Sequence, residues 1–324
     1  MSRTFSVLFF LGTFPLVFLA ALPASAANPI LPPNTRAILD HIYDGRSDLA
    51  IPEARQMQQQ FPDLPLGFVL EDEALWWNIW CYAAEFKYGM TMPRHREKLP
   101  GDHHYLEVAA KAYALAEANL ARQESAEMYL YAGMAGALTA RLYSLRGEAR
   151  STARVGVRAR GSFERALTLD PSLADADFGL GLYNYYVDTL STMARVMRFF
   201  MGIPGGSKEE GIRQLQHAIR DGQITPVAAR YYLALNLHNY DQKYQEALQV
   251  LEPLVTQYSG NALFHLGVGD LYAKLGQKQQ AAASYQAASA AAAKLPDAEC
   301  RAKVDLLVRA SLAAVGGGPA ASKP

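Results

Sequence analysis

The stretch HLGVGDLYAKLGQKQQAAASYQAA, residues 265–288, sets small and aromatic side chains at regular intervals. The residues that carry the pattern are spaced by 3, 4, 5, 4 and 3 positions: Gly269, Tyr272, Gly276, Ala281, Tyr285 and Ala288. Spacings of 3 and 4 place side chains on one face of a helix. Two helices approach closely where Gly or Ala faces the partner, and large side chains fill the space between such points. The stretch therefore predicts two short antiparallel helices that reverse at Gly276.

Weaker copies of this pattern precede it. The nearest copy has its matching positions at Ala234-Leu235, His238, Ala247, Leu251 and Leu254. Further back, Pro171 ends one unit, and Leu180-Gly181 lie in the first helix of the next. Near the N-terminus the same register is met by Gly45, Ala50, Ala54 and Pro62. Self-similarity at a fixed period is the signature of a repeat protein.

The pattern resembles the tetratricopeptide repeat (TPR), a helical hairpin of about 34 residues. The resemblance is clearest at 262–294 and extends back through 163–254. The run Gly-Leu-Tyr-Asn-Tyr-Tyr at 181–186, with the later Pro-Gly-Gly and Glu-Gly, is similar to exported bacterial TPR proteins without assigned chemistry. The resemblance implies an all-α, right-handed α-solenoid of about six TPR-like hairpins over residues 31–294. A last helix at 297–314 is expected to cap the stack.

Three of the hairpins are expected to be longer than the standard repeat. The fourth position of each unit falls at Phe68, Tyr129, Asp177, Tyr231 and His265. Only the last of these steps has the standard length of about 34 residues, and the three earlier steps are all longer. We expect the extra residues to lengthen the two helices of each hairpin, with no β-strand between Pro62 and Gly222.

The run RVMRFFMGIPGG, residues 195–206, is interpreted as the far end of one long hairpin. Helical spacing continues to Met201, and Pro204-Gly205-Gly206 predicts the chain reversal. The neighbouring long hairpins are expected to bury Met193, Met197, Phe199 and Phe200. A phosphate-binding loop does not fit, because the order here is Gly-Gly-Ser-Lys. A tip that enters a membrane, with Arg195 and Arg198 beside apolar residues, is the alternative.

The segment 1–26 has the layout of a secretory signal peptide. Arg3 precedes an apolar core from Phe5 to Leu22, and Ala24-Ser25-Ala26 provides the cleavage site. No later apolar run reaches the ~18–20 residues of a spanning helix, so no integral membrane span is expected after signal removal. We expect an exported protein, periplasmic or secreted. Its TPR-like domain would cover 27–315, and 316–324 would be a disordered tail.

Charge and cysteine content narrow the partners and the covalent structure. The chain has 31 basic and 31 acidic residues, so it has no broad electrostatic footprint for nucleic acid. The two cysteines, Cys81 and Cys300, are far apart in the sequence. Because the units of an open solenoid contact only their neighbours, we expect both to be buried free thiols, and a disulfide between them would require the superhelix to close.

Two polar clusters are interpreted as solvated surface. His103, His104 and Glu107 lie within about one helical turn, but neither an H-E-x-x-H motif nor a third ligand accompanies them. A zinc-dependent hydrolase built on these residues is kept only as a remote alternative. A basic stripe, able to meet an acidic partner or anionic lipid, is predicted along one helix by four arginines at every fourth position: Arg146, Arg150, Arg154 and Arg158.

The TPR resemblance implies that a partner binds the concave face, which the first helix of each unit lines. Transferred position by position, the candidate partner-binding residues are Phe178, Tyr185, Tyr186, Tyr232, Asn236 and Tyr240, with Leu182, Leu266 and Asp270 beside them. Asn236 matches an asparagine of the family's carboxylate clamp, but Tyr232 stands where that clamp has a lysine. The face is therefore aromatic and weakly polar, and it suits an apolar peptide, a lipid-like group or another helix.

No motif in the chain indicates catalysis. There is no nucleophile elbow, paired-carboxylate motif, glycine-rich cofactor fingerprint or strong metal spacing. We therefore expect no catalytic residues, no cofactor and no metal. The leading hypothesis is a non-enzymatic exported scaffold that binds a protein or peptide in its concave groove. The alternative is a periplasmic carrier or accessory subunit for a small apolar solute, as TPR subunits of TRAP-type transport systems imply.

Overall fold

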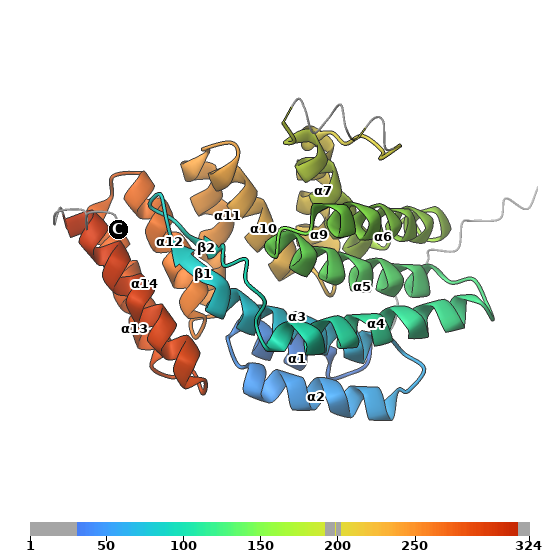
Figure 1. Ribbon diagram of the computed structural model, residues 1–324. Coiled ribbons are helices and arrows are strands. Elements are labelled where there is room, and N and C mark those ends of the chain that lie inside the picture. The colour runs from blue at the N-terminus through green and yellow to red at the C-terminus, as the bar shows by residue number, and fades with distance from the viewer. Residues whose placement is uncertain (1–30, 192–197, 199–201, 317–324) are drawn as a thin grey trace, which may run out of the picture.

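The computed structural model describes residues 31–191, 198 and 202–316. In these ranges thirteen helices and one two-stranded sheet form the fold (Figure 1). The helices are α1 (Thr35–Tyr43), α2 (Ser47–Gln60), α3 (Leu66–Ala83), α4 (Gly101–Leu120), α5 (Ala126–Leu145), α6 (Ala149–Leu169), α7 (Ala174–Asp188), α9 (Lys208–Asp221), α10 (Pro226–Asn239), α11 (Tyr244–Gln257), α12 (Ala262–Lys274), α13 (Lys278–Ala292) and α14 (Ala298–Gly316). The strands are β1 (Ala84–Phe86) and β2 (Thr91–Pro93). The predicted signal peptide lies outside the described residues, as does the tail beyond Gly316.

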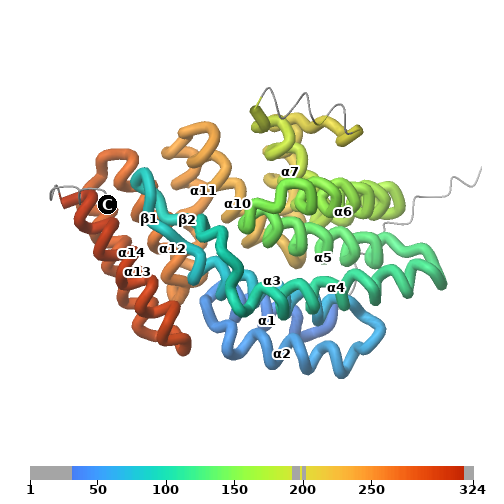
Figure 2. Tube along the Cα trace, viewed as in Figure 1, coloured from blue at the N-terminus to red at the C-terminus, as the bar shows by residue number. Residues whose placement is uncertain are grey.

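Each helix packs against the next along the chain, so the molecule is a succession of helical hairpins (Figure 2). Small residues mark the points where paired helices touch. A Cβ atom at Gly269 in α12 would lie 2.5 Å from the ring of Tyr285 in α13. A Cβ atom at Gly181 in α7 would lie 2.8 Å from the side chain of Leu215 in α9. The predicted all-α class with consecutive packing is therefore confirmed.

The second long unit is an elongated helical hairpin, as predicted. Its helices α5 and α6 are 20 and 21 residues long, whereas the helices from α10 to α13 have 13 to 15 residues. The connection between α5 and α6 is short, from Arg146 to Glu148. The residues in excess of the standard repeat have therefore lengthened the two helices.

The first long unit contains a β-hairpin, so the expectation of no strand between Pro62 and Gly222 is wrong. Helices α3 and α4 have 18 and 20 residues, and both strands lie in the connection between them. The strands pair antiparallel with Ala84 opposite Pro93. The φ angles of 59° at Tyr88 and 70° at Gly89 form the turn. Two-residue turns of this kind favour Asn-Gly or Asp-Gly, so Tyr-Gly is a weak hairpin signal.

The first helix of the third long unit is interrupted after Asp188, which corrects the prediction of one continuous helix. Helix α7 ends at Asp188. Lys208, the first residue of α9, lies close to this end, because its amide donates a hydrogen bond of 3.0 Å to the Asp188 carboxylate. Pro204 lies at the base of the excursion rather than at its far end, because its carbonyl accepts a 2.9 Å hydrogen bond from Tyr183. Residues 192–197 and 199–201 lie outside the described part of the chain. The predicted burial of Met193, Met197, Phe199 and Phe200 falls on them, as does the membrane alternative at Arg195.

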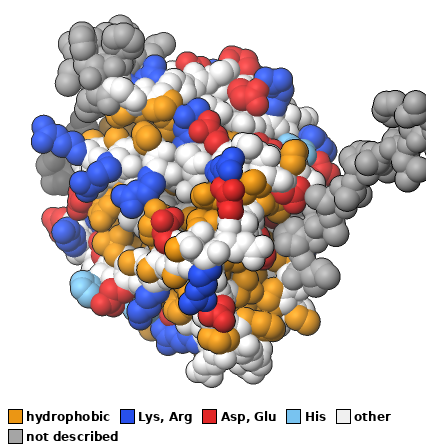
Figure 3. All heavy atoms as spheres, turned by 90° about the vertical axis from the view of Figure 1, so that its right-hand side faces the viewer, with side chains coloured by type: hydrophobic (Ala, Val, Ile, Leu, Met, Phe, Trp, Pro, Cys, Tyr) orange, Lys and Arg blue, Asp and Glu red, His pale blue; other side chains and the backbone are white. Residues whose placement is uncertain are grey.

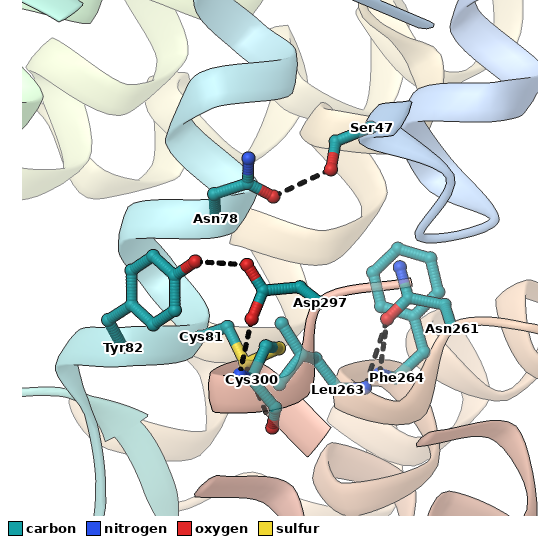
Figure 4. Close-up of a disulfide and its surroundings, with 9 residues drawn as sticks. All are labelled: Ser47, Asn78, Cys81, Tyr82, Asn261, Leu263, Phe264, Asp297 and Cys300. Atoms are coloured by element: carbon teal, nitrogen blue, oxygen red, sulfur yellow. Dashed lines mark hydrogen bonds between the residues drawn. A yellow bond between two sulfur atoms is a disulfide. The ribbon is translucent and has the colours of Figure 1, made fainter. Parts of the chain in front are cut away.

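A disulfide joins Cys81 in α3 to Cys300 in α14 across 219 positions of sequence (Figure 4). The two Cα atoms are 5.8 Å apart. Next to the disulfide, Tyr82 donates a hydrogen bond to Asp297, and Asp297 accepts another from the Cys300 amide at 2.8 Å. The expectation of two free thiols is wrong. The predicted capping helix, observed as α14, packs both on α13 and on α3.

The N-terminal helix also meets the last hairpins. Tyr258 donates to Asp40 at 3.0 Å, and the Gly260 amide donates to Asp44 at 2.8 Å. The Asn261 side chain donates to the carbonyl of Tyr43 at 2.7 Å. The stack therefore curves until its first and last units touch. This curvature brings Cys81 to Cys300, which an open solenoid would keep apart.

Candidate functional site

The candidate site is the inner surface, defined here as the faces of α3, α5, α7, α10 and α12 that meet α1 or the β-hairpin. Around one cavity of about 30 Å³, α1 meets four of these helices through Leu39 and Tyr43. Around a second cavity of about 20 Å³, the hairpin meets α3, α10 and α12 through Met90 and Thr91. Each of these volumes holds about one water molecule. Segments of the chain itself therefore cover much of the expected groove.

The six predicted partner-binding residues lie on α7, on α10 and directly after α10, and most of them are buried. Phe178, Tyr185, Tyr232 and Asn236 are at most 8% exposed. The rings of Phe178 and Tyr232 are in contact, with centroids 6.1 Å apart. The side-chain nitrogen of Asn236 has no hydrogen-bond partner among the described residues. The TPR register did not predict this burial.

The other two predicted residues, Tyr186 and Tyr240, form an aromatic cluster with Tyr185 at the C-terminal ends of α7 and α10. The rings of Tyr185, Tyr186 and Tyr240 lie within 6.2 Å of one another between centroids. The Tyr185 hydroxyl donates to the Asn236 carbonyl at 3.1 Å and to Asp241 at 2.8 Å. Tyr186 is half-buried, whereas Tyr240 is 51% exposed. Tyr240 is therefore the member of the six that a partner can reach directly.

A buried ion pair occupies the centre of the inner surface. The guanidinium of Arg141 in α5 donates to Glu73 in α3 at 2.9 Å, and both side chains are 11% exposed. The carbon of the guanidinium lies 5.0 Å from the ring centroid of Trp76 and 5.1 Å from that of Tyr232. Burial acts to lower the pKa of Arg141, but Glu73 raises it above the ordinary value. The guanidinium therefore stays charged and is stabilised by the two aromatic rings.

Asp72, next to this pair in α3, is fully buried. Neither of its carboxyl oxygens has a hydrogen-bond partner in the part of the chain that the structure describes. Burial raises its pKa well above the ordinary value, although Arg141 acts in the opposite direction. Burial therefore favours the protonated, uncharged form of Asp72. Sequence reasoning missed Asp72, Glu73 and Arg141, although the acidic run 71–73 inside an otherwise apolar helix was an available signal.

The hairpin is held on α12 through its backbone. The amide of Thr91 donates to the carboxylate of Asp270 at 2.6 Å. The ammonium of Lys274 donates to the carbonyl of Tyr88 at 2.6 Å. Asp270 and Lys274 are four positions apart, so they share one face of the helix. Asp270 was expected to face the groove, and in the structure it binds an extended segment of the same chain.

Two titratable groups next to the smaller cavity have displaced pKa values. Burial, assisted by the charge of Lys274, lowers the pKa of His238 to about 4. Burial raises the pKa of Asp270 to about 7, although hydrogen bonds from Thr91 and Tyr285 oppose this shift. Displaced pKa values occur at catalytic sites and also in buried structural networks. A cavity of about 20 Å³ is too small for an organic substrate, so the arrangement supports backbone binding better than catalysis.

His103, His104 and Glu107 lie at the exposed start of α4, where they were expected. The His103 side chain is 84% exposed. The His104 ring also contacts other residues of the protein, Arg55 at 3.2 Å and Glu71 at 3.5 Å. Among the described residues, no group of three or more His, Cys, Asp or Glu side chains is placed to hold a metal ion.

The predicted basic stripe is shorter than expected. Arg146 lies at the end of α5, not in α6, and its side chain is 3% exposed. It forms two hydrogen bonds of 2.6 and 2.7 Å with Asp102 and a third with the carbonyl of His95. Arg150 and Arg154 are exposed, and Arg158 lies over the ring of Tyr113. The prediction of four solvated arginines was wrong for Arg146 because α6 begins only at Ala149.

The outer surface at one end of the molecule shows basic and acidic side chains interspersed with small hydrophobic areas (Figure 3). Within the described residues, no helix combines the length and apolar character that crossing a membrane requires. A comparison with models of known protein families found no match to this chain. A comparison with curated proteins also found no match.

Proposed function

We propose that this chain is a non-enzymatic, exported scaffold that binds an extended segment of a protein or peptide partner on its inner surface. We further infer that its hairpins are TPR-like units of a right-handed solenoid. The close contacts at Gly181 and Gly269 support the TPR register, because they fall where the repeat pattern places small residues.

One observation carries the functional proposal. Side chains of α12 already bind the backbone of the β-hairpin, with Asp270 on the amide of Thr91 in β2 and Lys274 on the carbonyl of Tyr88 in the turn. Such contacts do not depend on the side chains of the bound strand. A helix face that holds one backbone segment in this way is therefore suited to hold another of similar shape.

The disulfide supports the proposed export. Disulfides form and persist in oxidising compartments such as the bacterial periplasm, and they are rare in the cytosol. A periplasmic or secreted location agrees with the Cys81–Cys300 bond and with the leader at residues 1–26.

A carrier for a small apolar solute is the second candidate. Its support is the apolar lining of the larger cavity, which α1, α3, α5 and α7 share. At about 30 Å³ this cavity is far below the ~300 Å³ at which ligand pockets begin. A solute would require the helices to separate, whereas a peptide would require only that the covering hairpin move. The scaffold is therefore the stronger proposal.

Site-specific photo-cross-linking tests the choice. A photoreactive p-benzoylphenylalanine replaces Tyr240 in one variant and Leu306 in another, and both proteins are irradiated in the cell envelope. These positions are matched in exposure at 51% and 57%, but Leu306 lies on α14, away from the inner surface. The scaffold predicts a protein adduct from position 240 and none from position 306.

A lipid or solute adduct at position 240 would favour the carrier. Equal protein adducts from both positions would contradict an inner-surface site. In parallel, the double change Tyr186→Ala and Tyr240→Ala should abolish the specific adduct measured from a second inner-surface probe, while circular dichroism shows unchanged helix content.

A further inference from the structure

The β1–β2 hairpin occupies the α10–α12 part of the inner surface as a bound peptide would. Thr91 is 3% exposed and Met90 is 5% exposed, so both enter the interior. They line the small cavity together with Trp80, Tyr231 and His238. An apolar residue followed by a small residue is thus the sequence type that this part of the surface accepts.

We propose that this surface binds a partner's extended segment of the same type, an apolar residue followed by a small one, and that the hairpin is a built-in occupant which the segment displaces. The proposal rests on the proposed scaffold function and names the class of partner. Asp270 would accept the amide hydrogen of the small residue, as it does from Thr91.

The hairpin fits its site incompletely, which is the first reason that another segment can replace it. The hydroxyl oxygen of Thr91 and both ring nitrogens of His238 are buried without hydrogen-bond partners in the described part of the chain. Buried polar groups without partners cost free energy. The adjoining cavity of about 20 Å³ leaves room for one more polar group. A segment that offers a hydrogen-bonding side chain to His238 would fit better than Thr91 does.

The hairpin itself is small and has a strained turn, which is the second reason that another segment can replace it. Its strands have three residues each, and a two-stranded hairpin of this size is marginally stable on its own. Its turn holds Tyr88 at a φ of 59°, in the left-handed region that bulky residues adopt at a cost. The Tyr88 side chain is 82% exposed, so it gains little from packing. The strands lie in the connection between α3 and α4, and therefore neither helix must unfold when they leave.

Peptide binding to a variant with an emptied site tests the proposal. Residues 85–92 are replaced by a Gly-Ser linker of equal length, and binding of a fluorescent peptide with the sequence KYGMTMP is measured by anisotropy. We expect the linker variant to bind about tenfold more tightly than the wild type, because the competing strand is absent. In the linker background, Asp270→Asn should weaken binding about tenfold, the loss typical of one charge-assisted hydrogen bond. Lys278→Met, an exposed change outside the site, should leave binding unchanged.

The decisive control is in the peptide. N-methylation at the Thr position removes the hydrogen that Asp270 accepts, whereas N-methylation at the following Met leaves it in place. The proposal predicts loss of binding with the first peptide and binding with the second. Equal affinity of the two peptides, or equal affinity of wild type and linker variant, would overturn it.

Hydrogen exchange on the unmodified protein gives an independent reading if the linker variant does not fold. The Thr91 amide should exchange through local opening, faster than the amides in the middle of α3 and α12. Protection of Thr91 up to the level of global unfolding would overturn the proposal. A protein adduct at position 240 with no peptide binding would leave the scaffold function standing and remove only this inference.

Discussion

Loss of the Cys81–Cys300 disulfide should lower the free energy of unfolding more than any other single covalent change in this chain. The perturbation is the double change Cys81→Ala and Cys300→Ala, which leaves no unpaired thiol. The bond closes a loop of 219 positions. In the chain-entropy account a loop of this length removes about 5 kcal/mol of unfolded-state entropy, and measured losses for native disulfides are about 2–5 kcal/mol. We therefore expect a destabilisation of about 3–5 kcal/mol.

Urea unfolding followed by circular dichroism at 222 nm measures this difference. The wild type is examined with and without reductant, and the double variant serves as the control that reductant must not affect. Because repeats contact mainly their neighbours, the loss should appear first as faster hydrogen exchange in α14 and α1, where the stack closes. A difference below about 1 kcal/mol, or a wild type insensitive to reductant, would refute the claim that this bond closes the stack.

Four further substitutions have defined outcomes. Asp270→Asn should flatten the pH dependence of stability. In the wild type the folded protein keeps a proton on Asp270 up to a pKa of about 7, whereas the unfolded chain releases it near 3.8, so stability falls as pH rises through this window. In urea unfolding between pH 5 and 7.5, the wild type should lose about 2–3 kcal/mol more stability than the variant. Gly179→Ala should lower the free energy of unfolding by at least about 2 kcal/mol, measured by thermal unfolding, because the added Cβ would lie 2.0 Å from the ring of Phe163. Gly156→Ala in α6 should instead raise it by about 0.5–1 kcal/mol, because a Cβ added there meets nothing within 4 Å. Arg141→Met should destabilise by about 3 kcal/mol, since it leaves a buried carboxylate without its partner, and a neutral effect in denaturant unfolding would argue against a charged pair at the centre of the inner surface.

The repeat pattern predicted the hairpins because their contacts are local. Gly269 and Tyr285 are only sixteen positions apart, and the side chains that face each other follow directly from helical spacing. The elongated α5 and α6 were predictable for the same reason. The β-hairpin was not, because its Tyr88-Gly89 turn lacks the Asn or Asp that usually marks such turns.

Features that depend on the curvature of the whole stack were beyond the repeat pattern. Small rotations between successive hairpins add up until α14 meets α3, and no local spacing encodes that sum. The disulfide and the contact between α1 and the last hairpins both follow from it. The burial of Phe178 and Asn236 was likewise not predicted from the repeat register.

The proposed binding mode states that the hairpin and a partner segment compete for one site on α12. Hydrogen exchange of the Thr91 amide in the wild-type protein, followed as the KYGMTMP peptide is added, measures this competition directly. The account predicts that exchange at Thr91 accelerates in step with peptide saturation, while the amides of α12 stay protected. Peptide binding that leaves Thr91 as protected as before would contradict it, because the peptide would then be bound elsewhere.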